Sequence, residues 1–109
     1  MKRTFMVVYK PYKGKDQELL PAVKASYLDL RKGGYVTSQP PMLMKASDGS
    51  IILIFEWIEK QKKEEAQVDP VIQQHWMTLS KICEFEKAMT LIEFQKPFSD
   101  FETIEWIDL

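Results

Sequence analysis

His75 is the residue of this chain best suited to proton transfer, because it is the single histidine and imidazole is the side chain that titrates near neutral pH. As a general base, it could remove a phenolic proton and leave an electron-rich anion that reacts with oxygen without a metal or a flavin. The alternative is a structural histidine at the rim of an apolar helix face. The pattern favours contact with a ligand over catalysis, and it leaves open whether the protein is an enzyme.

Four aromatic residues and one acidic residue are the other candidates for a small-molecule site. They are Tyr9, Tyr27, Glu56, Trp57 and Trp76. Aromatic rings pair with a flat ligand in offset or edge-to-face geometry, so the four could form a box around it. The alternative is that they belong to an ordinary hydrophobic core. The carboxylate either contributes to the site from a partly buried position or lies in water at the end of its strand.

The remaining reactive residues lack the neighbours that their chemistry requires. Cys83 has no basic neighbour in the sequence that would favour a thiolate, so we expect it to be a small buried hydrophobe. One cysteine and one histidine provide neither a disulfide nor a pair of soft metal ligands, and we expect no metal site. Ser80 lies outside any G-x-S-x-G pattern, and no glycine-rich loop could cradle a phosphate. Hydrolase and nucleotide-binding functions therefore have no support.

Length and charge narrow the class of protein further. The 109 residues are enough for one hydrophobic core, so we expect a single domain over residues 1–109. With 15 basic and 16 acidic residues, the chain lacks the basic surplus that nucleic-acid binding needs. The apolar run Phe5 to Tyr9 is too short for a signal peptide, and no run is long enough to span a membrane. We expect a cytoplasmic protein with neither nucleic acid nor membrane as a partner.

The segment Ile51 to Ile58 (IILIFEWI) predicts a strand that is apolar on both faces. Side chains alternate along a strand, so the set beginning with Ile51 and ending with Trp57 points to one side and the set beginning with Ile52 points to the other. Thr4 to Lys10 has the same character. A sheet built from such strands needs a cover on each face.

The remaining segments complete an alternating order of strands and helices. The sequence predicts a first helix from a cap at Asp16 to Lys32, although Pro21 is unfavourable inside a helix. A strand at Met42–Ala46 and a turn at Ser47–Ser50 come before the central strand, and a charged helical run at Glu59–Glu65 follows it. The second long helix runs from the Asp69-Pro70 cap to Glu84 or Phe85, and after it we expect a helical extension or short extra element at Ala88–Phe94 and a last strand at Phe101–Ile107. This order, βαββαβ, predicts an α+β ferredoxin-like fold with a four-stranded antiparallel sheet. Two helices cover only one face of such a sheet, so we expect a homodimer through the other sheet face.

Several segments together resemble the antibiotic biosynthesis monooxygenase family of the dimeric α+β barrel superfamily. They are the strand ending in Phe55-Glu56-Trp57, the charged connector, the Asp69-Pro70 helix that carries His75-Trp76, and Pro97-Phe98 before the final strand. The resemblance covers nearly the whole chain. It implies that two ferredoxin-like subunits join their sheets into a barrel and that each subunit holds its ligand between helices and sheet.

The resemblance implies cofactor-independent oxidation of aromatic rings, quinol oxidation or haem breakdown as activities. The haem-degrading branch relies on an asparagine, a tryptophan and a histidine, and this chain contains no asparagine. We therefore expect no cofactor, and a small aromatic or quinone-like molecule as the ligand. His75 would be the base or a hydrogen-bond donor, and Tyr27, Glu56, Trp57 and Trp76 would shape the pocket. The alternatives are a non-catalytic homodimer that binds a small ligand or serves as an accessory protein, and an isomerase or dehydratase of the same superfamily.

Overall fold

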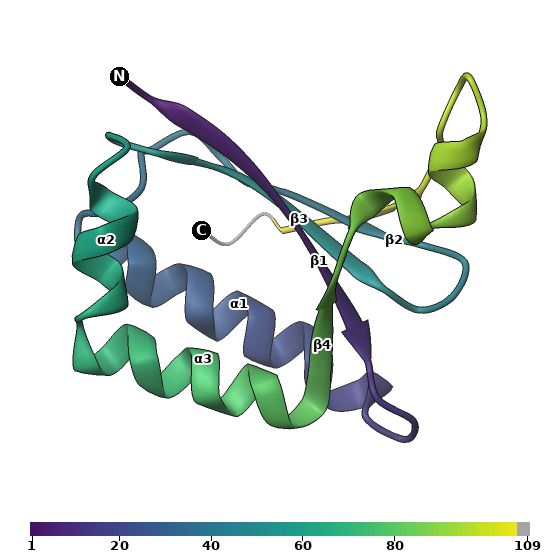
Figure 1. The fold of residues 1–109 in the computed structure, drawn as a ribbon, viewed down its shortest axis with the longest axis horizontal. Helices are drawn as coiled ribbons and strands as arrows, with labels where there is room; N and C mark the ends of the chain where they lie inside the picture. Colours follow the sequence, from purple (N-terminus) through teal and green to yellow (C-terminus); the bar gives the residue numbers. More distant parts are fainter. Residues whose placement is uncertain (107–109) are drawn as a thin grey trace.

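The computed structural model describes residues 1–106, which form one antiparallel sheet with helices packed on it (Figure 1). The strands are β1 (Arg3–Pro11), β2 (Met42–Lys45), β3 (Ile51–Trp57), β4 (Cys83–Glu86) and β5 (Glu102–Ile104). The helices are α1 (Asp16–Lys32), α2 (Lys62–Gln67) and α3 (Pro70–Ile82), followed by two short 3-10 helices, η1 (Ala88–Thr90) and η2 (Ile92–Gln95). The strand order is β4-β1-β3-β2-β5.

The sheet has five strands, so the expectation of four was wrong. The strand that completes the ferredoxin-like order next to β1 is β4, which the sequence had placed at the end of a helix. Cys83 adopts an extended backbone, with φ −151° and ψ 166°, and pairs with Pro11, while Phe85 pairs with Tyr9. The predicted last strand is present as the shorter β5, which pairs with β2 at the far edge. Ile107, its expected end, lies outside the described residues.

Two helix starts were predicted from the sequence, with different outcomes. Asp69 caps α3 as expected, because its side chain accepts a hydrogen bond from the Val71 backbone N–H at 2.9 Å. The Tyr35 hydroxyl donates to the same carboxylate at 2.6 Å, and this bond holds the pKa of Asp69 below its usual value. Asp16 is the first residue of α1 and makes no capping bond. Pro21 lies inside α1 without ending it, because the bond it forfeits is to Gln17 in the exposed first turn.

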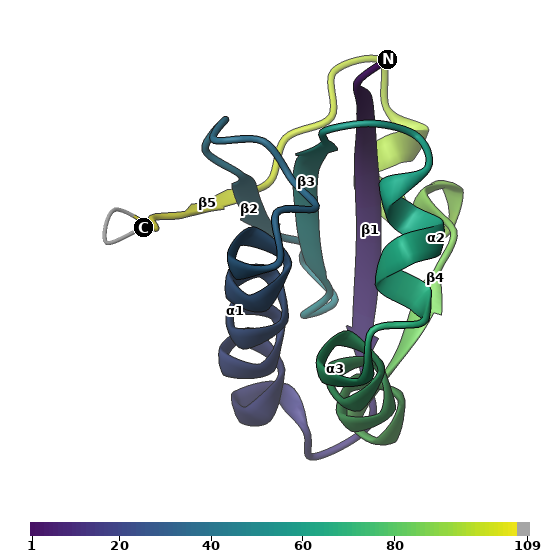
Figure 2. The same ribbon diagram turned by 90° about the vertical axis from the view of Figure 1, so that its left-hand side faces the viewer.

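The helices α1 and α3 lie side by side on one face of the sheet, and α2 connects β3 to α3 (Figures 1 and 2). The alternate side chains that begin with Phe5 in β1 and with Ile51 in β3 face the helices, as their alternation in the sequence predicted. Tyr9, Leu53 and Trp57 pack there against α1 residues such as Val23 and against the buried residues of α3. We call this side the inner face. No helix within residues 1–106 has both the length and the apolar character required to cross a membrane.

The opposite side of the sheet, the outer face, is partly covered by the chain itself. Residues 88–101, which include η1 and η2 and are called the outer cover below, pack on it. Leu91 of this segment is buried together with Val8 and Ile52 of the sheet. Two methionines on the same face, Met6 and Met42, remain 44% and 57% exposed. The chain therefore supplies part of the second cover that its strands require.

Candidate functional site

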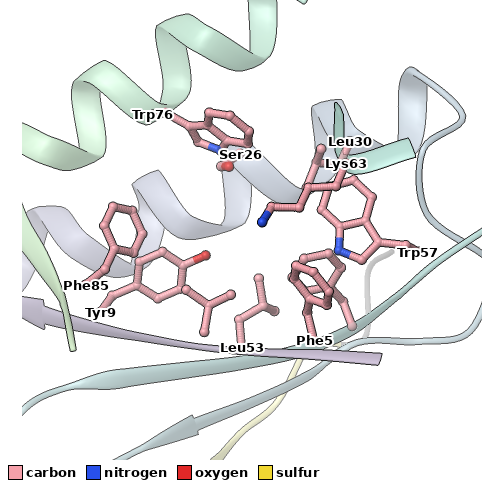
Figure 3. A pocket seen from close by; sticks show the side chains of 11 residues that line it. Phe5, Tyr9, Ser26, Leu30, Leu53, Trp57, Lys63, Trp76 and Phe85 are labelled. Carbon is pink, nitrogen blue, oxygen red and sulfur yellow. The ribbon is translucent and has the colours of Figure 1, made fainter. Parts of the chain in front are cut away.

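A cavity of about 270 Å³ lies between the inner face of the sheet and the helices (Figure 3). Its wall is made almost entirely of apolar and aromatic side chains that come from every layer of the fold. They are Phe5, Val7 and Tyr9 of β1, Leu53, Phe55 and Trp57 of β3, Ser26 and Leu30 of α1, Lys63 of α2, Trp76 of α3 and Phe85 of β4. We call this space the aromatic cavity.

The sheet positions its part of the wall through alternation and register. The two central strands pair so that Phe5 lies opposite Phe55 and Val7 lies opposite Leu53. Alternate residues of both strands therefore point to the same side of the sheet. Phe5 meets Trp57 edge-on at a centroid separation of 5.6 Å, and Phe55 meets Trp57 at 5.3 Å. These ring contacts fix one end of the cavity.

The aromatic cavity also contains a few polar groups. The Trp57 side chain is buried, and its indole Nε1 has no hydrogen-bond partner among the described residues. Figure 3 shows this nitrogen and the Lys63 Nζ turned toward the same space. Burial raises the pKa of Tyr9 far above its usual value, with a further contribution from Cys83. The Tyr9 hydroxyl therefore stays protonated at neutral pH and can donate a hydrogen bond to a ligand.

Two of the predicted binding residues, Trp57 and Trp76, line the aromatic cavity. Tyr27 lies behind the wall instead, because its ring packs edge-on against Phe55 at 6.0 Å and against Trp106 at 5.5 Å. Burial also raises the pKa of Tyr27. Tyr27 thus supports the wall from the core and does not face the cavity.

His75 lies outside the wall, at the contact between α1 and α3. Its Nε2 is 2.5 Å from the Asp29 carboxylate of α1. Since a carboxylate only accepts, this nitrogen carries the hydrogen and donates it. The pair is partly exposed and links the two helices that roof the cavity.

Glu56 points to the outer face, because it alternates with Trp57 along β3. Its carboxylate accepts a hydrogen bond from the Thr37 hydroxyl at 2.9 Å. The structure therefore does not bring Glu56, Tyr27 and His75 together in one space.

The wall includes residues that the sequence had not singled out. Phe5 and Val7 share a strand face with Tyr9, so alternation could have identified them. Lys63 stands in a run of charged residues, where no pattern separates it from its neighbours.

Cys83 does not line the aromatic cavity. Burial raises the pKa of its thiol to about 11, and the thiol donates a hydrogen bond to the Leu79 carbonyl. Residues 1–106 contain no group of three or more His, Cys, Asp or Glu side chains placed so that they could hold a metal ion.

The fold and the cavity together define a small α+β protein with an apolar chamber between its helices and its sheet. No protein-family model and no curated protein matches the sequence. Three solved structures share the fold. The protein SO0527 from Shewanella oneidensis has a TM-score of 0.63 at 15% identity, over 78% of this chain and 84% of its own. Rv0793 from Mycobacterium tuberculosis has a TM-score of 0.65 at 11% identity, over 79% of this chain and 89% of its own.

The third structure is SnoaB, a cofactor-independent oxygenase from Streptomyces nogalater. It has a TM-score of 0.61 at 18% identity, over 78% of this chain and 86% of its own. At these identities the likeness concerns the fold. The chain therefore shares its α+β fold with these three proteins, which agrees with the fold that the sequence resemblance implied.

Proposed function

We propose that the protein binds a small aromatic or quinone-like molecule in the aromatic cavity and that it is a cofactor-independent monooxygenase-like protein. The observation that carries this proposal is the cavity itself, which is lined by aromatic rings from both the sheet and the helices. Its volume of about 270 Å³ is slightly below the roughly 300 to 1,000 Å³ common for ligand pockets. A flat molecule of up to three fused rings suits this space.

The proposed chemistry starts with the loss of a phenolic proton from the bound molecule. The resulting anion is electron-rich and can react directly with dioxygen. One oxygen atom becomes a new carbonyl on the ring, the other leaves as water with the two hydrogens that the substrate loses, and the substrate supplies the electrons. In the proposal Trp57 and Trp76 contact the ring system, and Tyr27 holds Phe55 in place behind it. His75 remains the predicted base or hydrogen-bond donor, although its Nε2 is bonded to Asp29.

The first experiment measures oxygen consumption with anthrone and quinol substrates. We expect uptake with the unmodified protein, and a rate reduced at least tenfold in His75→Ala if His75 transfers the proton. Ser80→Ala, an exposed change on the same helix, is the matched control. Equal rates in the unmodified protein and in His75→Ala would show that His75 does not transfer the proton. If compounds bind but none causes oxygen uptake, the proposed oxygenase activity is wrong.

A second candidate function is non-catalytic binding of a small ligand, in an accessory role. It is favoured by the wall, which among the described residues contains no carboxylate or histidine that could act as a base. The ionisable wall residues are Lys63 and Tyr9, and the raised pKa of Tyr9 keeps its hydroxyl protonated. The two candidates separate in one pair of measurements on the same compound. Saturable binding without oxygen uptake supports the second candidate, whereas uptake that saturates with binding supports the first.

We also propose that the protein forms a homodimer through the part of the outer face that its own outer cover leaves open. Met6 and Met42 are exposed there, and both pair with Ile54, so the three side chains form one apolar row across the sheet. A second copy would bury this row. Light scattering should give twice the chain mass for the protein and the single mass for Met6→Lys. A single mass for the unmodified protein at micromolar concentration would contradict the dimer.

A further inference from the structure

One end of the aromatic cavity carries two nitrogen donors for which residues 1–106 provide no acceptor. Trp57 is only 3% exposed, and its Nε1 has no partner within residues 1–106. A buried donor without an acceptor is unfavourable, and such groups are uncommon unless a ligand or water completes them. The unsatisfied indole therefore points to an acceptor atom that arrives with a ligand.

Lys63 provides the second donor and a positive charge. Its Nζ lies over the Phe5 ring at 5.5 Å from the centroid, and Phe5 is also in contact with Trp57. In the described part of the chain, no carboxylate lies within salt-bridge distance of this ammonium group, whereas the neighbouring Lys62 is paired with Glu65 at 3.1 Å. Lys63 is thus the cation of α2 that is free to meet a ligand.

A second, smaller hollow of about 160 Å³ adjoins the cavity at this end. It shares Phe5, Trp57 and Lys63 with the aromatic cavity. Its other lining residues are Arg3, Lys60 and Glu64. Three cations against one carboxylate give this end of the cavity a positive potential, which attracts anions and raises their rate of arrival.

We infer that the aromatic cavity selects molecules that carry an oxyanion on a flat apolar body. The anion would accept hydrogen bonds from Trp57 Nε1 and Lys63 Nζ, and the apolar rings would fill the space toward Tyr9 and Trp76. A neutral carbonyl could accept hydrogen bonds from the indole and from the ammonium group, but an anion also gains the attraction between opposite charges at Lys63. This inference rests on the proposed function, because it specifies the ligand of the same cavity.

The test compares two probes of matched shape, 2-naphthoate and the uncharged 2-naphthylmethanol, by isothermal titration calorimetry at neutral pH. We expect the naphthoate to bind about tenfold tighter, with an affinity that falls as salt is added. Lys63→Met keeps the length of the side chain and removes its charge, so it should abolish this preference and leave the alcohol unaffected. Lys62→Met, one residue earlier on the same helix, should change neither affinity.

The variant Trp57→Phe tests the indole donor separately. It keeps an aromatic ring in the wall and should weaken naphthoate binding several-fold, with the circular dichroism spectrum confirming the fold. Equal binding of both probes to the unmodified protein would overturn the inference and leave the aromatic cavity as a binding site. Binding of neither probe would overturn the proposed function as well. A preference for naphthoate that persists in Lys63→Met would assign the selectivity to other groups and also overturn the inference.

Discussion

Both faces of the sheet carry apolar side chains, but they are covered in different ways. The inner face lies under α1 and α3, and the aromatic cavity remains between them. The outer face is partly covered by residues 88–101, which pack directly on Val8 and Ile52. The comparison shows that the longer helices leave an aromatic chamber, whereas the short outer cover packs directly on the sheet and the hollow beside it is lined mainly by polar residues such as Ser47, Glu93 and Asp100.

The largest effect should come from the buried part of the outer face. Ile52 is fully buried, so Ile52→Ala should lower the free energy of unfolding by about 3 kcal/mol through lost burial and the void left behind. Ile54 lies two residues further along the same face and is only partly buried. Both changes are made in the Met6→Lys variant, in which no second copy covers Ile54, and there Ile54→Ala should cost about 1 kcal/mol. Urea unfolding measures both, and equal losses would show that the outer cover does not protect Ile52.

The next effect concerns binding on the inner face. Val7 lines the aromatic cavity, and Val7→Phe would place a ring in the space that the ligand needs. We expect the affinity for 2-naphthoate to fall roughly tenfold, about 1.4 kcal/mol. Met6→Phe is the matched control, because Met6 is the adjacent residue on the outer face and is exposed. A similar loss of affinity in both variants would contradict a ligand site confined to the inner face.

A smaller effect should appear on the outer cover as the pH falls. Glu93 of η2 accepts a hydrogen bond from the Ser47 backbone N–H at 2.7 Å, and this bond holds the pKa of Glu93 below its usual value. A lowered pKa in the folded state means that the stabilisation is complete above the usual carboxyl pKa and is lost as the pH falls through the lowered value.

The variant Glu93→Gln isolates this contribution, because it keeps an acceptor for Ser47 but cannot titrate. The difference in unfolding free energy between the protein and Glu93→Gln should therefore be present at neutral pH and shrink as the pH falls below the usual glutamate range. Chemical denaturation at several pH values measures it. A difference that grows on acidification would show that the carboxylate is not stabilising in the folded protein.

Alternation and capping signals in the sequence were sufficient to predict most of the scaffold. The division of β1 and β3 into two faces and the Asp69 cap were correct because both depend on local geometry. The strand β4 was missed because Cys83 continues the apolar stripe of α3, four residues after Leu79, and so fits a helix as well as a strand. The role of residues 88–101 was missed because Leu91 packs on residues far away in the sequence, and no local period marks such a contact.

The candidate site was predicted less completely than the scaffold. Trp57 and Trp76 line the aromatic cavity because they lie on the inner side of β3 and α3, and their contact with a ligand stays a prediction. Glu56 could have been excluded from the cavity wall, because alternation along β3 already points it to the opposite face from Trp57. Neither the unsatisfied indole nor the unpaired Lys63 can be seen in a sequence, because both depend on which side chains converge in three dimensions.

The most direct test of the account uses the indole N–H signals of the three tryptophans in a two-dimensional NMR titration with 2-naphthoate. Trp57 and Trp76 line the aromatic cavity, whereas Trp106 packs against Tyr27 and Lys24 outside it. We predict that the signals of Trp57 and Trp76 shift together with saturation and that the signal of Trp106 stays in place. A shift of Trp106 alone, or no shift at saturating ligand, would contradict a binding site between the helices and the inner face.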